Sequence, residues 1–165
     1  MKKLLTTTCL VIGLILTTHI NSFAQEGQFK VGGGVGYGTE VEAIGIQAGA
    51  TYGFTEEISG AADVIFFFPE NIDWFEFNAN GHYKFLAEEG MSVYGLAGLN
   101  YVSISVDIPS FNGSGGGSVS NSEIGLNLGG GAEFDVDFAN IYGELKYVLS
   151  NADQLVLSAG LRFPI

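Results

Sequence analysis

Few side chains in this sequence could perform acid–base or nucleophilic chemistry. His82 is the single histidine after residue 24, and the single cysteine, Cys9, lies before residue 24. A serine hydrolase needs a histidine that a carboxylate orients beside a nucleophile, and a zinc site needs several histidine or cysteine ligands. His82 alternates with Asn80 and Lys84, which favours a packed polar residue. The sequence therefore predicts no catalytic residue, no metal site and no cofactor.

Eight charged side chains share the polar face of segments in which polar and apolar residues alternate. They are Lys30, Asp63, Glu76, Lys84, Glu133, Glu144, Lys146 and Arg162. Such charges could line an ion-conducting pore, or they could pair with one another inside a narrow barrel. Because an eight-stranded barrel is only just wide enough for side chains to fill it, we predict an interior ion-pair network. Glu133, Glu144, Lys146 and Arg162 come from adjacent segments and should form one such network.

The segments that must position these charges have a period of two, which is the spacing of a β-strand. In KVGGGVGYG, glycine occupies every even position from Gly32 to Gly38. The G-x-G-x-x-G spacing of a nucleotide-binding loop is absent. Eight alternating runs of about ten residues follow one another, at 29–38, 44–54, 62–68, 74–85, 92–106, 123–134, 140–148 and 155–163. The run 92–106 alternates without showing which of its faces is inward.

The bulk of the apolar side chains decides which face of the barrel points outward. A soluble barrel turns its apolar face inward, whereas a membrane barrel turns it toward lipid. An eight-stranded interior cannot hold the phenylalanine, tyrosine, leucine and isoleucine of every strand, but it can hold glycine, serine, asparagine and a few long charged side chains. The glycines then leave room for polar groups that reach across from other strands. We predict an all-β, eight-stranded antiparallel up-and-down transmembrane β-barrel.

The first 24 residues have the pattern of a cleaved secretory signal peptide. Lys2 and Lys3 precede a short apolar run at 10–16, and Ser22-Phe-Ala24 has the small residues of a cleavage site. We therefore expect a signal peptide at 1–24 and a barrel domain at 25–165. The segment 25–165 has four basic and 18 acidic side chains, a net charge of −14. Nucleic acid is excluded as a partner by this charge.

One low-complexity stretch, Ser110–Ser122, predicts a flexible connection over Asp107–Ser122. Its residues are mostly glycine and serine, which are entropically costly to order. Phe111 is the aromatic side chain in this stretch. If the protein makes contacts outside the cell, Phe111 is the expected anchor, because aromatic residues carry much of the energy of such contacts. Packing of Phe111 on the barrel rim is the alternative.

Three segments resemble the small outer-membrane β-barrel family, which includes OmpX-like proteins and the barrel domain of OmpA-like proteins. They are GLNLGGGAEF (125–134), YGELKY (142–147) and LSAGLRF (157–163). The resemblance implies a bacterial outer membrane location and contact with outer-membrane lipid. Ser158, Gly160, Phe163 and Ile165 resemble the C-terminal signal that the barrel-assembly machinery reads. We expect the protein to be a monomer.

Three functions are compatible with this fold, since a fold does not fix a function. The first is a non-enzymatic structural or surface-interaction role in the cell envelope. The second is a small solute or ion pore, which an open inward channel would favour. The third is a lipid-modifying enzyme, which a serine beside His82 at the rim would favour.

Overall fold

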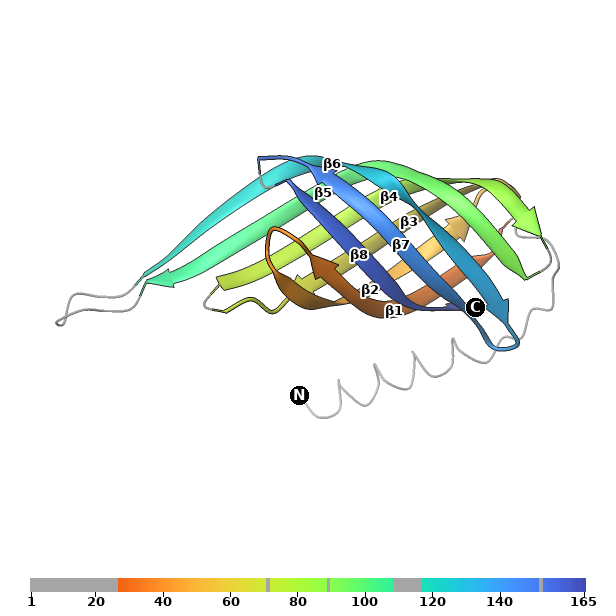
Figure 1. The fold of residues 1–165 in the computed structure, drawn as a ribbon, viewed down its shortest axis with the longest axis horizontal. Coiled ribbons are helices and arrows are strands. Elements are labelled where there is room, and N and C mark those ends of the chain that lie inside the picture. Colours follow the sequence, from red (N-terminus) through yellow and green to blue (C-terminus); the bar gives the residue numbers. More distant parts are fainter. Residues whose placement is uncertain (1–26, 71, 89, 109–116, 152) are drawn as a thin grey trace, which may run out of the picture.

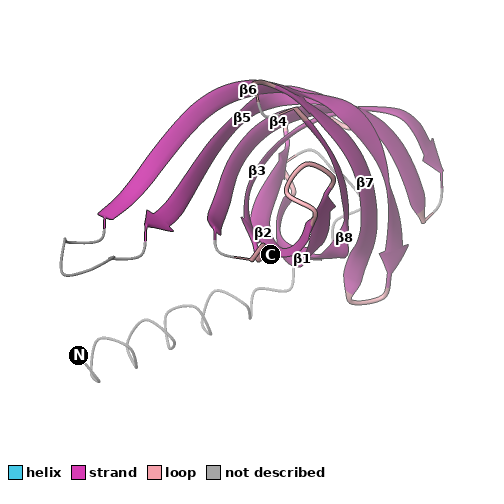
Figure 2. Cartoon of the chain, turned by 60° about the vertical axis from the view of Figure 1, so that its left-hand side comes forward, coloured by secondary structure: helices cyan, strands magenta, loops and turns pink. Residues whose placement is uncertain are grey.

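The computed structural model describes residues 27–165 except 71, 89, 109–116 and 152, and it confirms the predicted barrel. The strands are β1 (Phe29–Gly38), β2 (Ala43–Gly53), β3 (Ile58–Phe67), β4 (Ile72–Glu88), β5 (Met91–Ile108), β6 (Gly117–Val136), β7 (Ala139–Leu149) and β8 (Gln154–Pro164). Each strand pairs antiparallel with the next, and β8 pairs with β1 to close the barrel (Figures 1 and 2). The expected signal peptide, 1–24, lies outside the described residues.

The two ends of the barrel differ, and we name them by what they carry. The termini end holds the start of β1, the end of β8 and the β2–β3, β4–β5 and β6–β7 connections. The hairpin end holds the other four connections, and there β5 and β6 project beyond the remaining strands (Figure 1).

Exposure alternates along the strands as the period of two predicts, with the apolar face outward. On β2, Ile44 and Ile46 are 64% and 57% exposed, whereas Gln47 is buried. On β8, Leu157 is exposed and Ser158 is buried. An outward apolar face of this kind is what lipid requires.

The run 92–106, whose faces the sequence leaves undecided, turns its even-numbered residues inward. Ser92, Tyr94, Leu96, Asn100 and Val102 are buried, and they belong to β5. Both faces of this strand carry apolar residues, so hydrophobicity alone could not separate them.

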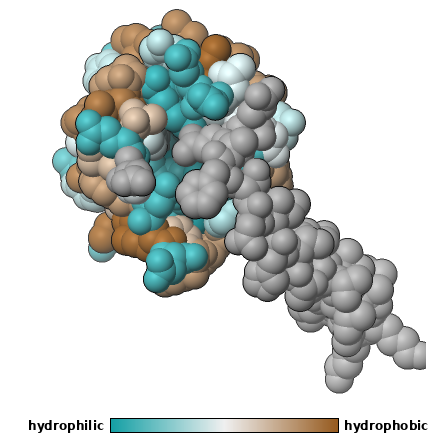
Figure 3. Space-filling model, turned by 90° about the vertical axis from the view of Figure 1, so that its right-hand side faces the viewer, coloured by the Kyte–Doolittle hydropathy of each residue, from teal (hydrophilic) through white to brown (hydrophobic). Residues whose placement is uncertain are grey.

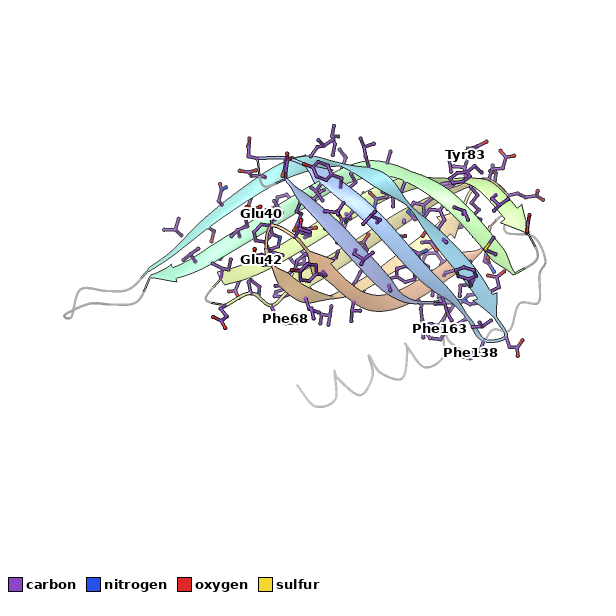
Figure 4. The ribbon with its side chains drawn as sticks, viewed as in Figure 1. Glu40, Glu42, Phe68, Tyr83, Phe138 and Phe163 are labelled. Carbon is purple, nitrogen blue, oxygen red and sulfur yellow. The ribbon has the colours of Figure 1, made fainter. Side chains whose placement is uncertain are left out.

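Aromatic side chains gather toward the two ends. Tyr83, Phe138 and Phe163 project outward near the termini end, and Phe68 lies toward the hairpin end (Figure 4). At the termini end, apolar surface surrounds a polar centre (Figure 3). Two aromatic belts around an apolar band are typical of barrels that cross a bilayer.

Three strands are longer than the runs 74–85, 92–106 and 123–134 that the sequence predicts. β4, β5 and β6 have 17, 18 and 20 residues. The predicted loop over 107–122 is wrong at both ends, because β5 continues to Ile108 and β6 begins at Gly117. Serine and asparagine favour a loop by composition, but here Asn121 pairs with Ile104 of β5, and Ser120 and Ser122 pair with serines of the same strand. The hydroxyls of Ser105 and Ser120 also bond across the two strands at 2.9 Å.

The barrel interior contains an apolar cluster at the hairpin end, which the sequence does not predict. We call it the apolar plug, and its buried members are Val41, Ala43, Ile65, Phe67, Trp74, Val102, Val148 and Val156. Ile72 and Ile104 pack against it and are partly buried. The prediction of an interior made of small and polar residues is therefore wrong at the hairpin end.

Arginine at Leu157 should lower the stability of the barrel by about 2–4 kcal/mol, because this exposed position of β8 points into lipid. Urea unfolding in lipid vesicles measures the loss. The control is Ser120→Arg, on the exposed outer part of β6, which should change stability by no more than about 0.5 kcal/mol. Equal losses at both positions would contradict the outward assignment of the apolar face.

Candidate functional site: the barrel interior and the outer hairpin

Four charged side chains from four strands meet inside the barrel near the termini end. The ammonium of Lys30 (β1) pairs with Glu133 (β6). Arg162 (β8) reaches both carboxylates, with Nη1 2.8 Å from Glu133 Oε2 and Nη2 2.6 Å from Glu144 Oε1 on β7. All four are buried. We call them the ion cluster, in which two cations balance two carboxylates.

Two tyrosines complete the surroundings of Arg162. The hydroxyl of Tyr94 donates to Glu144 at 2.6 Å and accepts from Arg162 Nη1 at 3.2 Å. The guanidinium carbon of Arg162 lies 4.0 Å from the centre of the Tyr142 ring, a cation–π distance. Arg162 therefore pairs with both carboxylates of the ion cluster and contacts both tyrosines.

The glycines of β1 and β8 provide the space that these large side chains occupy. A Cβ added to Gly34 would lie 2.7 Å from the Tyr142 hydroxyl, and a Cβ added to Gly160 would lie 2.8 Å from the same ring. Both distances are far below van der Waals contact. Gly32 and Gly34 thus face bulky polar groups from neighbouring strands. Gly36 and Gly38 instead face side chains that belong mainly to the apolar plug.

The other four charges of the predicted network lie apart from the ion cluster. Asp63 accepts hydrogen bonds from Gln47 and Asn78, both at 3.0 Å. Lys84 Nζ lies 3.4 Å from the carbonyl oxygen of Glu56. Glu76 lies among side-chain amides and accepts from Asn100 Nδ2 at 3.1 Å.

Lys146 differs from the expectation that it shares one network with Glu133, Glu144 and Arg162. It is buried, but none of the ion pairs between described residues includes it. Its cross-strand neighbours are Gly129 and Val156 rather than acidic residues. The period of two places Lys146 on the inward face, but it does not decide which carboxylate lies within reach.

A layer of side-chain amides fills the interior next to the apolar plug. Asn78 Oδ1 accepts from the amides of Asn100 and Asn127, both at 2.9 Å. Glu76 accepts from Trp74 Nε1 and Asn100 Nδ2, each at 3.1 Å, and from Gln154. This carboxylate is almost fully buried and is satisfied by neutral N–H donors.

His82 is buried inside the barrel and packs against an aromatic ring. Its ring stacks on Tyr94, with 4.6 Å between ring centres and 12° between ring planes. Ser59 is its cross-strand neighbour. Among the described residues, His82 makes no hydrogen bond to a serine or a carboxylate, and its Nε2 has no partner.

Within the described part of the chain, no group of three or more histidine, cysteine, aspartate and glutamate side chains is placed to hold a metal ion. The described residues also contain no helix that is long and apolar enough to cross a membrane.

Two small cavities lie beside the ion cluster, with volumes of about 30 and 20 Å³. His82, Arg162 and Thr51 border both of them. Each has room for one or two water molecules. The apolar plug fills the barrel interior at the opposite, hairpin end.

The four residues that resemble an assembly signal lie at the end of β8 and just after it. Ser158 is buried and Gly160 faces the interior beside Tyr142. Phe163 points outward, and the N–H of Ile165 donates to the carbonyl of Phe29 at 2.9 Å. Recognition of these four residues by the barrel-assembly machinery stays a prediction.

The projecting β5–β6 hairpin has a strand edge without a neighbour. β6 pairs with β5 down to Gly117, but its pairing with β7 begins only at Leu126. Over Gly117–Ile124 the edge that faces away from β5 is therefore unpaired within the described structure. We call this segment the free edge. Phe111, the expected contact residue, lies outside the described residues.

The pairing with β5 determines which residues of the free edge have unbonded N–H and C=O groups. The N–H of Asp135 on β6 donates to Gly90 beside the start of β5, and the β5–β6 register runs without a shift from there to Gly117. Odd-numbered residues of β6 therefore bond to β5, and even-numbered ones point away from it. On the free edge these are Ser118, Ser120, Ser122 and Ile124.

Glu123 lies on the inward side of the free edge, opposite Val102 of β5. Its Oε1 accepts from Asn121 at 3.2 Å, whereas its Oε2 is buried and has no partner among the described residues. No motif in the sequence singles out Glu123. Its place in the alternation shows only that it faces the interior, and the missing neighbour appears only once β7 is seen to end at Leu149.

The sequence and the fold are similar to those of known outer-membrane proteins. Residues 12–163 match the family model of the outer membrane protein beta-barrel domain. The chain belongs to this family. Its place is therefore the bacterial outer membrane. In barrels of this kind the longer connections face the outside of the cell and the short turns face the periplasm, which puts the hairpin end outside.

Solved structures of outer-membrane proteins share the fold. The N-terminal β-barrel domain of Pseudomonas aeruginosa OprF is 12% identical with a TM-score of 0.65, and the match covers 85% of this chain and 98% of that one. Ail, the attachment invasion locus protein of Yersinia pestis, is 18% identical with a TM-score of 0.60, covering 85% and 99%. Neisserial surface protein A is 18% identical with a TM-score of 0.61, covering 84% and 96%. No curated protein matches the chain.

Proposed function

We propose that this protein is a non-enzymatic surface-interaction barrel that contacts its partner through the β5–β6 hairpin. The observation that carries the proposal is the free edge, Gly117–Ile124, which projects beyond the barrel on the outer side. A row of unpaired N–H and C=O groups is a template on which an extended peptide can add as a further strand. Natural barrels close their sheets and so remove such edges. Here the barrel closes, yet eight residues of β6 stay open.

The interior supports this role over a pore or an enzyme. The apolar plug occupies the outer half of the barrel, and the ion cluster and amide layer occupy much of the rest. The two cavities are of water size. His82 has the neighbours of a packed residue rather than those of a catalytic base.

The charge of the surface indicates what kind of partner it suits. The four basic residues of 25–165 all lie at inward positions, in β1, β4, β7 and β8. One solved structure of Ail is a complex with the heparin analogue sucrose octasulfate, a polyanion. A surface with acidic residues and no outward cation does not suit such a ligand. We therefore propose a protein partner that is neutral or basic.

The protein would act as a monomer embedded in outer-membrane lipid, inserted by the barrel-assembly machinery. Insertion by this route is supported by membership of the family and by the C-terminal sequence pattern, which consists of Ser158, Gly160, Phe163 and Ile165. Support for a monomer is the closed barrel itself, which leaves no strand edge unpaired within the apolar band.

Removing one backbone donor from the free edge should weaken strand addition. The variant is Ser122→Pro, because Ser122 directs its N–H away from β5, and proline is tolerated on an edge strand at such a position. The probe is a fluorescent peptide of about nine residues in which threonine alternates with valine. Its affinity for the refolded barrel in detergent, measured by anisotropy, should fall at least about tenfold.

Ser122→Ala is the matched control, since it removes the same hydroxyl and keeps the N–H. It should bind the peptide as the unchanged protein does. Heat-modifiable mobility on gels verifies that each variant is folded. Equal binding to the proline and alanine variants, or no binding to the unchanged protein, would reject the free edge as the contact element.

A further inference from the structure

The free edge presents an unequal pattern of side chains to any strand that would join it. Its outward-facing residues include Ser120 and Ser122, which are exposed. Val119, Asn121 and Glu123 share the opposite face, which continues the inward face of the barrel. Val119 and Asn121 are themselves exposed, whereas Glu123 is partly buried. An added strand would place its own side chains on the same two faces. Every second side chain of the partner strand would thus contact the inward face, and the residues of this face differ most in polarity and charge.

Glu123 is the side chain at this edge whose hydrogen bonding is incomplete. One carboxylate oxygen accepts from Asn121, and the other is buried without a partner. Leaving a buried carboxylate oxygen unpaired is costly, and such a group in a native structure calls for an explanation. None of the ion pairs among the described residues involves Glu123. Its β5 neighbour, Val102, has no donor to offer.

The geometry of an antiparallel ladder places the partner's side chain close to this carboxylate. Glu123 has an odd number, so its backbone groups bond to β5 and not to the added strand. The residue across from it would occupy a non-hydrogen-bonded position, where the Cα atoms approach to about 4.5 Å and the side chains are closest. A lysine or arginine there can reach the free oxygen, whereas a carboxylate there would be repelled.

We propose that the free edge selects extended peptide segments that carry a lysine or arginine opposite Glu123, with uncharged residues at the neighbouring inward positions opposite Val119 and Asn121. This rests on the proposed function, since it needs strand addition at the same edge. It adds the chemical class of the partner, a basic strand of a protein. The absence of outward cations on 25–165 agrees with it, because such a partner meets no opposing positive charge on the barrel surface.

Peptides that differ at one position test the inference. Two fluorescent peptides of about nine residues alternate threonine with valine and differ at the central inward position, which is lysine in one and glutamine in the other. The lysine peptide should bind the barrel about tenfold more tightly than the glutamine peptide at low salt. The variant Glu123→Gln should remove this preference. The control variant Glu70→Gln, at an exposed acidic residue of the outer rim, should keep it.

The outcomes separate the two proposals. Equal binding of both peptides, lost in Ser122→Pro, would overturn the selection of a basic residue and leave strand addition standing. A lysine preference that persists in Glu123→Gln would also overturn it and would assign the effect to the general negative charge. Binding of neither peptide would overturn both proposals. Heat-modifiable mobility of Glu123→Gln shows that the barrel is intact in these measurements.

Discussion

Leucine in place of Arg162 should lower the free energy of unfolding by about 3–5 kcal/mol, the cost of breaking a buried ion pair by removing one partner. Arg162 pairs with Glu133 and Glu144 and bonds to the Tyr94 hydroxyl. Its loss leaves Glu144 buried with no cation and Glu133 with Lys30 alone. Urea unfolding of the refolded barrel, followed by tryptophan fluorescence from Trp74, measures the change.

Lys146→Met is the matched control for this experiment. Lys146 is as deeply buried as Arg162 and lies on the neighbouring strand, but it belongs to none of the ion pairs between described residues. Its replacement should cost clearly less than that of Arg162. A loss at Arg162 no larger than at Lys146 would mean that the ion cluster does not hold β6, β7 and β8 together.

The face that each of these residues occupies could be predicted from the sequence, whereas its height in the barrel could not. A period of two fixes that Glu144, Lys146 and Arg162 point inward. Which of them meet depends on strand tilt, and on how far each side chain extends. Lys146 lies only two residues from Glu144 along β7, yet Arg162 reaches that carboxylate and Lys146 does not.

The apolar plug and the hairpin escaped prediction for related reasons. The alternation in β3 is interrupted because Ile65 and Phe67 are apolar on the inward face, and a local pattern cannot tell such residues from a poorly formed strand. In β6, serine and asparagine over 118–122 have the composition of a loop. Their strand state comes from pairing with β5, which is tertiary context that overrides propensity.

The candidate contact site was therefore the least predictable part of the molecule. The free edge is defined by a difference in length, because β6 extends beyond β7. No residue type signals this difference. Glu123 becomes notable only through the partner that its second carboxylate oxygen does not find in the folded chain.

Alanine in place of Phe67 should lower the free energy of unfolding by about 3–5 kcal/mol, the usual range for removing a buried phenylalanine. Phe67 is 2% exposed and belongs to the apolar plug. Its removal opens a cavity that neighbouring strands cannot close, since the barrel fixes their spacing. A Cβ added to Gly45 would lie 2.9 Å from the Phe67 ring, which shows how tightly the ring fits.

Phe66→Ala provides a control of the same residue type on the same strand. Phe66 points outward, is 45% exposed and contacts Phe75 edge-to-face with 5.6 Å between ring centres. Lipid chains can occupy the space that its ring leaves, so no cavity remains, and the loss should be limited to about 0.5–1.5 kcal/mol for the aromatic pair together with lost contact area. Unfolding of both variants in lipid vesicles compares the two faces directly. A loss at Phe66 that equals or exceeds the loss at Phe67 would show that the plug adds little to stability and that the outer half of the barrel is held by its lipid face.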